Sequence, residues 1–76
     1  MNMTDVAKKM LLDLAKHPRA KEGAELRYSS DSTEKRAEIS AVDELVNLGY
    51  VIKTGSAIGF SILVITSAGE AAAIEI

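Results

Sequence analysis

The sequence predicts an α+β domain in which helices accompany a small three-stranded antiparallel sheet. Three observations lead to this prediction. Residues 31–48 place apolar side chains at helical spacing and are followed by Gly49. Residues 50–52 and 60–65 are rich in β-branched and aromatic side chains and flank a turn that contains glycine. Residues 24–29 alternate apolar and polar side chains, which is the period of a strand. With 76 residues, the chain has room for one domain, spanning residues 1–76.

The first element is a helix that either Thr4 or Asp5 can cap. Its apolar stripe contains Val6, Met10, Leu11 and Leu14. Pro18 ends the helix, because the residue before a proline is pushed out of the helical region.

Residues 19–30 allow two interpretations. The stretch 19–26 has fair helical composition, but Gly23 in its middle costs about 1 kcal/mol relative to alanine. Alternatively, residues 24–29 form a strand beside residues 60–65, and this interpretation is favoured. The strand at 60–65 is apolar almost throughout, so it belongs in the middle of the sheet, or one of its faces packs against a partner chain.

The second helix begins at Asp31, with Glu34 placed three residues later as the reciprocal member of a capping box. Residues 31–48 form either one long helix, which is favoured, or two helices with a kink at residues 39–40. Only the second alternative places a helix-turn-helix within this run. Gly49 closes the helix, since glycine adopts the left-handed conformation at no steric cost.

After the hairpin, Ser67 is expected to cap a short last helix, with Glu70 completing a capping box. The elements together predict one hydrophobic core. That core is expected to include Val6, Met10, Leu14, Leu26, Ile39, Val42, Leu45, Val46, Tyr50, Ile52, Ile62, Val64 and Ile65.

About half of the chain resembles the winged-helix (winged helix-turn-helix) family, in the form of a small prokaryotic or phage-type member. In that family the third helix runs into L-x-x-L-G-Y/L-I/V, and the second wing strand ends in L/I-T-x-x-G. The matching residues are Leu45, Leu48, Gly49, Tyr50 and Val51, then Ile65, Thr66 and Gly69. The resemblance implies a helix that enters the major groove of DNA and a hairpin wing that contacts the adjacent backbone or minor groove.

Composition limits the function classes. The chain has no cysteine, and its formal net charge is −2. Residues 1–36 contain eight of the nine Lys and Arg residues but six of the eleven acids, so a surface that contacts phosphates must come from this half. The single histidine, His17, has no nucleophile nearby in sequence, and no metal-ligand cluster is present. We expect no enzyme activity, no cofactor, no metal and no membrane span, and a cytoplasmic location.

Two kinds of binding remain. By resemblance, a transcription-regulator-like protein would contact double-stranded DNA through basic and hydroxyl side chains. These candidates are Arg19, Lys21, Arg27, Ser32, Thr33, Lys35, Arg36, Lys53 and Thr54. The wing has one basic residue, Lys53, where the family usually has several. Its apolar residues Ala57, Ile58 and Phe60 instead indicate a contact with a protein partner or with a second copy of the chain.

Overall fold

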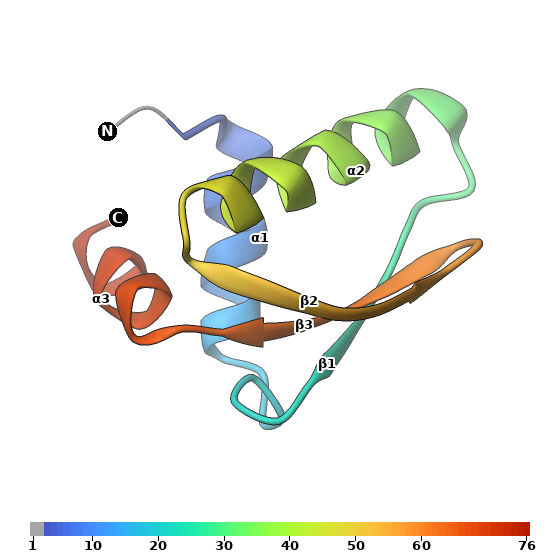
Figure 1. The fold of residues 1–76 in the computed structure, drawn as a ribbon. Helices are drawn as coiled ribbons and strands as arrows, with labels where there is room; N and C mark the ends of the chain where they lie inside the picture. Colours follow the sequence, from blue (N-terminus) through green and yellow to red (C-terminus); the bar gives the residue numbers. More distant parts are fainter. Residues whose placement is uncertain (1–2) are drawn as a thin grey trace.

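The computed structural model describes residues 3–76, which form three helices and a three-stranded antiparallel sheet (Figure 1). The elements are α1 (Asp5–Ala15), β1 (Ala24–Arg27), α2 (Ser32–Asn47), β2 (Val51–Ala57), β3 (Phe60–Ile65) and α3 (Ser67–Glu75). The strand order is β1-β3-β2, so β3 lies in the middle of the sheet. The predicted α+β class is confirmed at this level.

The two open alternatives of the sequence are resolved in the favoured direction. Residues 24–27 form strand β1, which pairs with β3 in a register that places Ala24 opposite Leu63. The backbone N–H of Tyr28 extends this pairing by donating to the carbonyl of Gly59 at 2.9 Å. Residues 32–47 form one continuous helix, so this run contains no kink and no second helix.

Thr4 caps α1, and the cap also joins α1 to α2. The Thr4 hydroxyl oxygen accepts a hydrogen bond from the Ala7 N–H at 3.2 Å. Its own hydroxyl and backbone N–H donate to the two carboxylate oxygens of Glu44, at 3.1 and 2.9 Å. A single residue thus satisfies an orphan amide of one helix and binds a side chain of the other.

Asp31 caps α2 as predicted, but the reciprocal half of the predicted capping box is not formed. The Asp31 carboxylate accepts from the N–H groups of Thr33 and Glu34 at 2.8 and 3.3 Å. Ser29 takes the place of the reciprocal contact. Its hydroxyl accepts from the Asp31 N–H at 3.1 Å and donates to the Glu34 carboxylate at 2.9 Å. At the other end, Gly49 has a positive φ of 78°, which closes the helix as predicted.

The predicted cap of the last helix was wrong by one residue. Thr66, not Ser67, is the N-cap of α3, and its hydroxyl accepts from the Gly69 N–H at 3.0 Å. The same hydroxyl donates to the Gly49 carbonyl at 2.7 Å, which ties α3 to the end of α2. Thr66 directly follows β3, which ends at Ile65, and its backbone is still extended. An extended backbone is the conformation of an N-cap residue. Glu70 pairs with Lys21 instead of completing a capping box.

The core lies between the helices and one face of the sheet. Its buried hydrophobic residues are Ala7, Met10, Leu11, Leu14, Ala20, Ala24, Ala41, Val42, Leu45, Tyr50, Val51, Leu63 and Ile65. The predicted core differs from this set in several places. Val6, Ile39, Val46 and Ile52 are exposed, while Leu26, Ile62 and Val64 are only half-buried. The sequence prediction omitted the buried alanines, Leu11, Val51 and Leu63.

The differences between the predicted and the observed core follow from side-chain periodicity. On β2, Val51 faces the helices, so Ile52 must face the opposite way. On α1 the buried stripe passes through Ala7 and Leu11, which places Val6 at its margin. None of the helices formed by residues 3–76 combines the length and the apolar composition that crossing a lipid bilayer requires.

Replacing Gly69 with alanine should destabilise the protein by about 1–3 kcal/mol, although alanine normally favours a helix. The added Cβ would overlap the Tyr50 carbonyl oxygen and lie 2.9 Å from Cγ1 of Ile65. Urea unfolding followed by circular dichroism measures the effect. Gly55→Ala is the matched control, because its Cβ would make only an ordinary 3.5 Å contact with Ile62. Equal stability of the two variants would contradict this close approach of α3 to the sheet.

Candidate interaction surface

The two faces of the sheet differ in how well they are covered. Along β3, Ser61, Leu63 and Ile65 are buried, whereas the alternate residues Phe60, Ile62 and Val64 are half-buried. Figure 1 shows α1 and α2 on one side of the sheet, and no helix formed by residues 3–76 covers the other side. The near-continuous apolar character of β3 therefore reflects its central position together with a second face that remains partly open.

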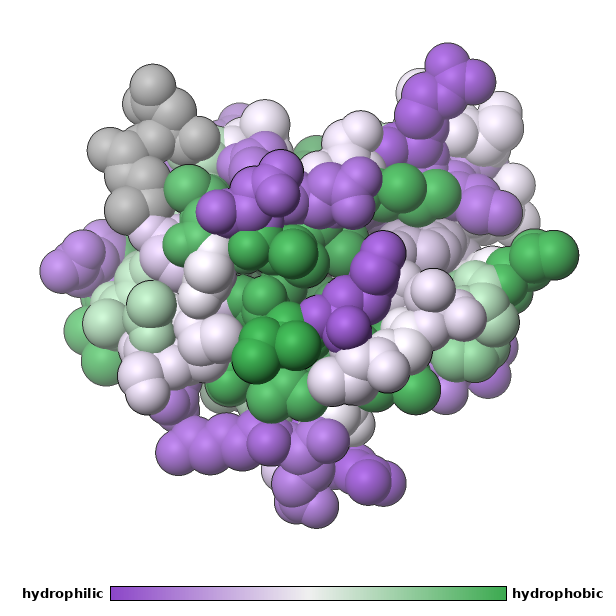
Figure 2. All heavy atoms as spheres, in the orientation of Figure 1, coloured by the Kyte–Doolittle hydropathy of each residue, from purple (hydrophilic) through white to green (hydrophobic). Residues whose placement is uncertain are grey.

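We call this second face the outer sheet face and define it by Ile52, Phe60, Ile62 and Val64, together with Gly55 and Ala57. Strand register brings these residues together in cross-strand pairs, since Ile52 lies opposite Val64, Gly55 opposite Ile62 and Ala57 opposite Phe60. Ile52 is 55% exposed. Figure 2 shows a group of apolar side chains over β2 and β3, and another at the tip of the hairpin.

The margin of the outer sheet face carries no net charge. Glu25 and Arg27 lie opposite Ile62 and Phe60 on β1. Their side chains form an exposed ion pair, with 2.7 Å between Arg27 Nε and Glu25 Oε2. An exposed pair of this kind contributes little to stability, but it leaves the surface electrically neutral.

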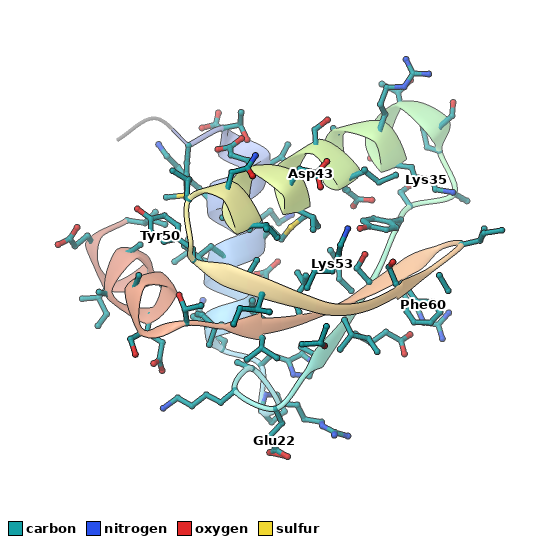
Figure 3. The ribbon with its side chains drawn as sticks, viewed as in Figure 1. Glu22, Lys35, Asp43, Tyr50, Lys53 and Phe60 are labelled. Atoms are coloured by element: carbon teal, nitrogen blue, oxygen red, sulfur yellow. The ribbon has the colours of Figure 1, made fainter. Side chains whose placement is uncertain are left out.

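The hairpin tip extends the outer sheet face. Ile58 and Gly59 connect β2 to β3, and the Ile58 side chain is 97% exposed. Phe60 begins β3 directly after this turn, at the hairpin end of the sheet (Figure 3). The three apolar residues proposed from the sequence as protein contacts, Ala57, Ile58 and Phe60, thus lie together.

The residues proposed as DNA contacts come from several elements of the fold. Arg19 and Lys21 lie in the loop between α1 and β1, and Arg27 ends β1. Ser32, Thr33, Lys35 and Arg36 occupy the first turns of α2, while Lys53 and Thr54 lie on β2. The candidates are thus distributed over one loop, one helix and two strands.

The charges around the DNA-contact candidates further reduce their positive potential. The Lys21 ammonium lies 3.3 Å from the Glu70 carboxylate, and Arg27 pairs with Glu25. Lys53 lies opposite Leu63 in the register, and Figure 3 shows its side chain directed toward α2. The helix that contains Lys35 and Arg36 also carries four carboxylates, those of Glu34, Glu38, Asp43 and Glu44.

His17 has a local structural contact. Its Nδ1 accepts a hydrogen bond from the Arg19 N–H at 3.0 Å, across the Pro18 turn. Within residues 3–76, no group of three histidine, aspartate or glutamate side chains is arranged to hold a metal ion.

Comparison with known protein families, curated proteins and solved structures finds no match to this chain. Function is therefore inferred from the outer sheet face and the hairpin tip. Sequence reasoning predicted the hairpin but assigned residues 54–59 to its turn, whereas β2 continues to Ala57 and only Ile58 and Gly59 connect the strands. It also assigned Ile52, Ile62 and Val64 to the core. Strand alternation from Val51 and Leu63 was the signal that could have assigned them to the opposite face.

Replacing Ile58 with serine should change the free energy of unfolding by less than about 0.5 kcal/mol, because the side chain has almost no contacts to lose. Leu63→Ala should cost about 2–5 kcal/mol, because Leu63 is fully buried in the same hairpin. Chemical denaturation of the two variants checks both values. A large loss for Ile58→Ser would mean that the hairpin tip packs against the fold.

Proposed function

We propose that the chain is a small winged-helix domain that acts as a non-catalytic protein-interaction module. Its outer sheet face and hairpin tip would contact a protein partner, which we take to be a second copy of the chain. The order of helices and strands, with the central strand β3 between β1 and β2, supports the winged-helix assignment. The observation that carries the function is the apolar outer sheet face, left uncovered by the helices of residues 3–76.

Electrical neutrality favours a second copy as the partner. In a two-fold interface, the same patch meets itself, so any net charge on it would be opposed by a like charge. The margin of the outer sheet face carries one ion pair between Glu25 and Arg27, and the face itself consists of apolar residues and glycine. Two copies can therefore pack face to face without burying an unpaired charge.

The size of the outer sheet face predicts weak association. Three strands about 4.8 Å apart, with the six-residue strand β3 in the middle, give a face of at most roughly 14 by 20 Å. Stable interfaces bury about 800 Å² of accessible surface on each partner, so a face of this size is at the small end even with the hairpin tip included. We expect a dissociation constant in the micromolar range or weaker.

Sedimentation equilibrium should reveal a concentration-dependent dimer that Ile52→Lys converts to a monomer, because the substitution places a charge in the apolar face. Ile74→Lys on α3 is the matched control and should leave the dimer unchanged, since Ile74 is 85% exposed and lies on another element. A chain that remains monomeric at about 1 mM would exclude a second copy as the partner.

DNA binding is the second candidate, and one observation favours it. The first turns of α2, with Ser32, Thr33 and Arg36 exposed, lie at the same end of the molecule as the hairpin tip (Figure 1). In the winged-helix family that the sequence resembles, a helix and a wing meet DNA together. The acidic residues of α2 count against this candidate, because each one repels phosphate.

Fluorescence anisotropy with random-sequence duplex DNA distinguishes the two candidates. With about three phosphate contacts, affinity should fall about 40-fold between 50 and 200 mM salt. Replacing Lys35 and Arg36 with alanine should abolish DNA binding and leave self-association intact. Replacing Ile58 and Phe60 with serine should do the reverse. Absence of binding at tens of micromolar protein would exclude non-specific DNA affinity.

A further inference from the structure

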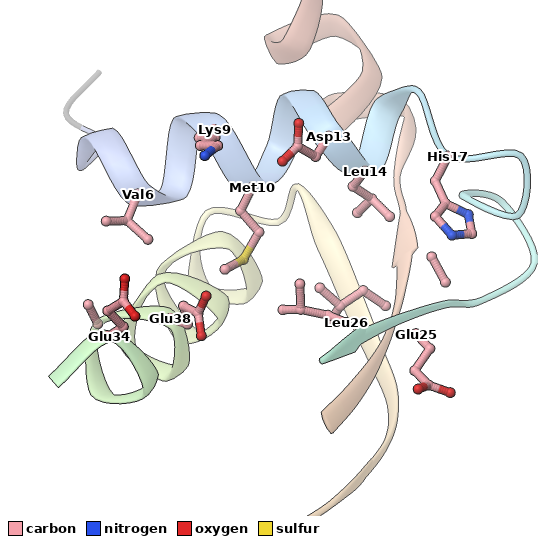
Figure 4. Close-up of a pocket in the computed structure, with 13 residues that line it drawn as sticks. Val6, Lys9, Met10, Asp13, Leu14, His17, Glu25, Leu26, Glu34 and Glu38 are labelled. Carbon is pink, nitrogen blue, oxygen red and sulfur yellow. The ribbon is translucent and has the colours of Figure 1, made fainter. Parts of the chain in front are cut away.

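A hollow of about 420 Å³ lies between α1, β1 and the N-terminal half of α2, on the helix side of the sheet (Figure 4). We call it the α1–α2 groove. It is half-open to solvent. Its lining residues are Val6, Lys9, Met10, Asp13, Leu14, His17, Ala24, Glu25, Leu26, Glu34, Ala37, Glu38 and Leu63. Apart from Glu25, none of these residues was placed on the outer sheet face or its margin, so the two surfaces are separate.

The floor of the groove is apolar and follows α1. Val6, Met10 and Leu14 recur every four residues, and Figure 4 shows them projecting toward the space between α2 and β1. Leu26 adds a half-buried side chain from β1. Val6 is 41% exposed, although it continues the apolar stripe. The stripe on α1 therefore extends beyond the part that the core covers.

The rim of the groove is acidic. Asp13, Glu34 and Glu38 supply three carboxylates, and Lys9 is the single lysine among the lining residues. Glu25 also lines the groove, but its carboxylate is paired with Arg27. Glu34 and Glu38 are held in place by Ser29, whose hydroxyl and backbone N–H donate to them at 2.9 and 2.7 Å. Each of these bonds uses only one carboxylate oxygen, so the second oxygen of each group can accept from a ligand.

We propose that the α1–α2 groove binds a short, basic, amphipathic helix of a partner protein. An apolar floor between acidic walls matches a helix with leucine-like side chains on one face and lysine or arginine on its flanks. α1 spans 11 residues, or about 16 Å, so two to three turns of a partner helix can lie along it. The volume admits about two or three of the apolar side chains that a helix presents at positions i, i+3, i+4 and i+7 in this mode of recognition.

Two other occupants fit the groove less well. A second copy of the chain in a two-fold arrangement would bring two acidic rims together, and like charges at an interface oppose binding. A small molecule is normally enclosed on most of its surface, whereas this groove is half-open. The proposal does not depend on the proposed function, because that function uses the outer sheet face.

The probe is a roughly 12-residue peptide, blocked at both ends, with leucines at i, i+3, i+4 and i+7 and lysines at the flanking positions. Its control has glutamate in place of every lysine. Amide chemical shifts of the whole chain, measured by NMR during titration, report both affinity and location. We expect the basic peptide to shift amides of α1, β1 and the first half of α2, and to bind at least about tenfold more tightly than the acidic peptide.

Two variants test the floor and the rim separately. Val6→Ser removes an exposed apolar side chain, and the pair Asp13→Asn with Glu34→Gln removes two charges while leaving an amide oxygen to accept from Ser29. Each should weaken the basic peptide about five- to tenfold. Glu75→Gln on α3 is the charge control and should leave affinity unchanged. Unfolding curves confirm that each variant is folded.

Several results would overturn the proposal. These are no shift at about 1 mM peptide, equal affinity for the two peptides, or shifts confined to β2 and the hairpin tip. Hexylammonium binding as tightly as the peptide would assign the groove to a small cation. Concentration-dependent shifts of groove amides without peptide would assign it to a second copy. Loss of self-association with intact peptide binding would contradict only the proposed function.

Discussion

The structure depends on the pairing of β3 with two strands at once. β3 is hydrogen-bonded to β1 on one edge and to β2 on the other, so it joins the N-terminal part of the chain to the hairpin. Its inner side chains Leu63 and Ile65 are buried against the helices, and Ser61 meets the Tyr28 hydroxyl at 2.7 Å. Removing β3 would leave neither a sheet nor a support for the helices. Because its two faces are both apolar, the pairing that builds the core also creates the outer sheet face.

A second constraint joins the helix ends to the sheet. The Thr66 N–H donates to the Tyr50 carbonyl, and its hydroxyl donates to the Gly49 carbonyl, so the start of α3 lies against the end of α2. Gly69 permits this approach because it has no Cβ. The motif residues that first indicated a family resemblance therefore have structural roles in this fold. They close a helix, end a strand and allow a close contact.

The two surfaces differ in charge, and this difference separates the partners that they favour. The outer sheet face is neutral and apolar, which suits a symmetric contact. The α1–α2 groove has an apolar floor and acidic walls, which suits a basic partner. Neither surface has the clustered positive charge that phosphate binding requires, and two basic residues of the first half of the chain, Lys21 and Arg27, are paired with carboxylates.

Local patterns determined most of the elements. Helical spacing, the cap at Asp31, the glycine at position 49 and the alternation over residues 24–29 were sufficient for the helices and strands, because each depends on residues near one another in sequence. Which apolar side chains became core was decided by packing. Val6 and Ile52 are as apolar as the buried residues beside them, but each lies one position away from the buried face. One position turns a side chain by about 100° on a helix and to the opposite face on a strand. Strand alternation could have assigned Ile52, Ile62 and Val64 to the outer sheet face, but the groove exists only where α1, β1 and α2 meet, so no local pattern in the sequence could reveal it.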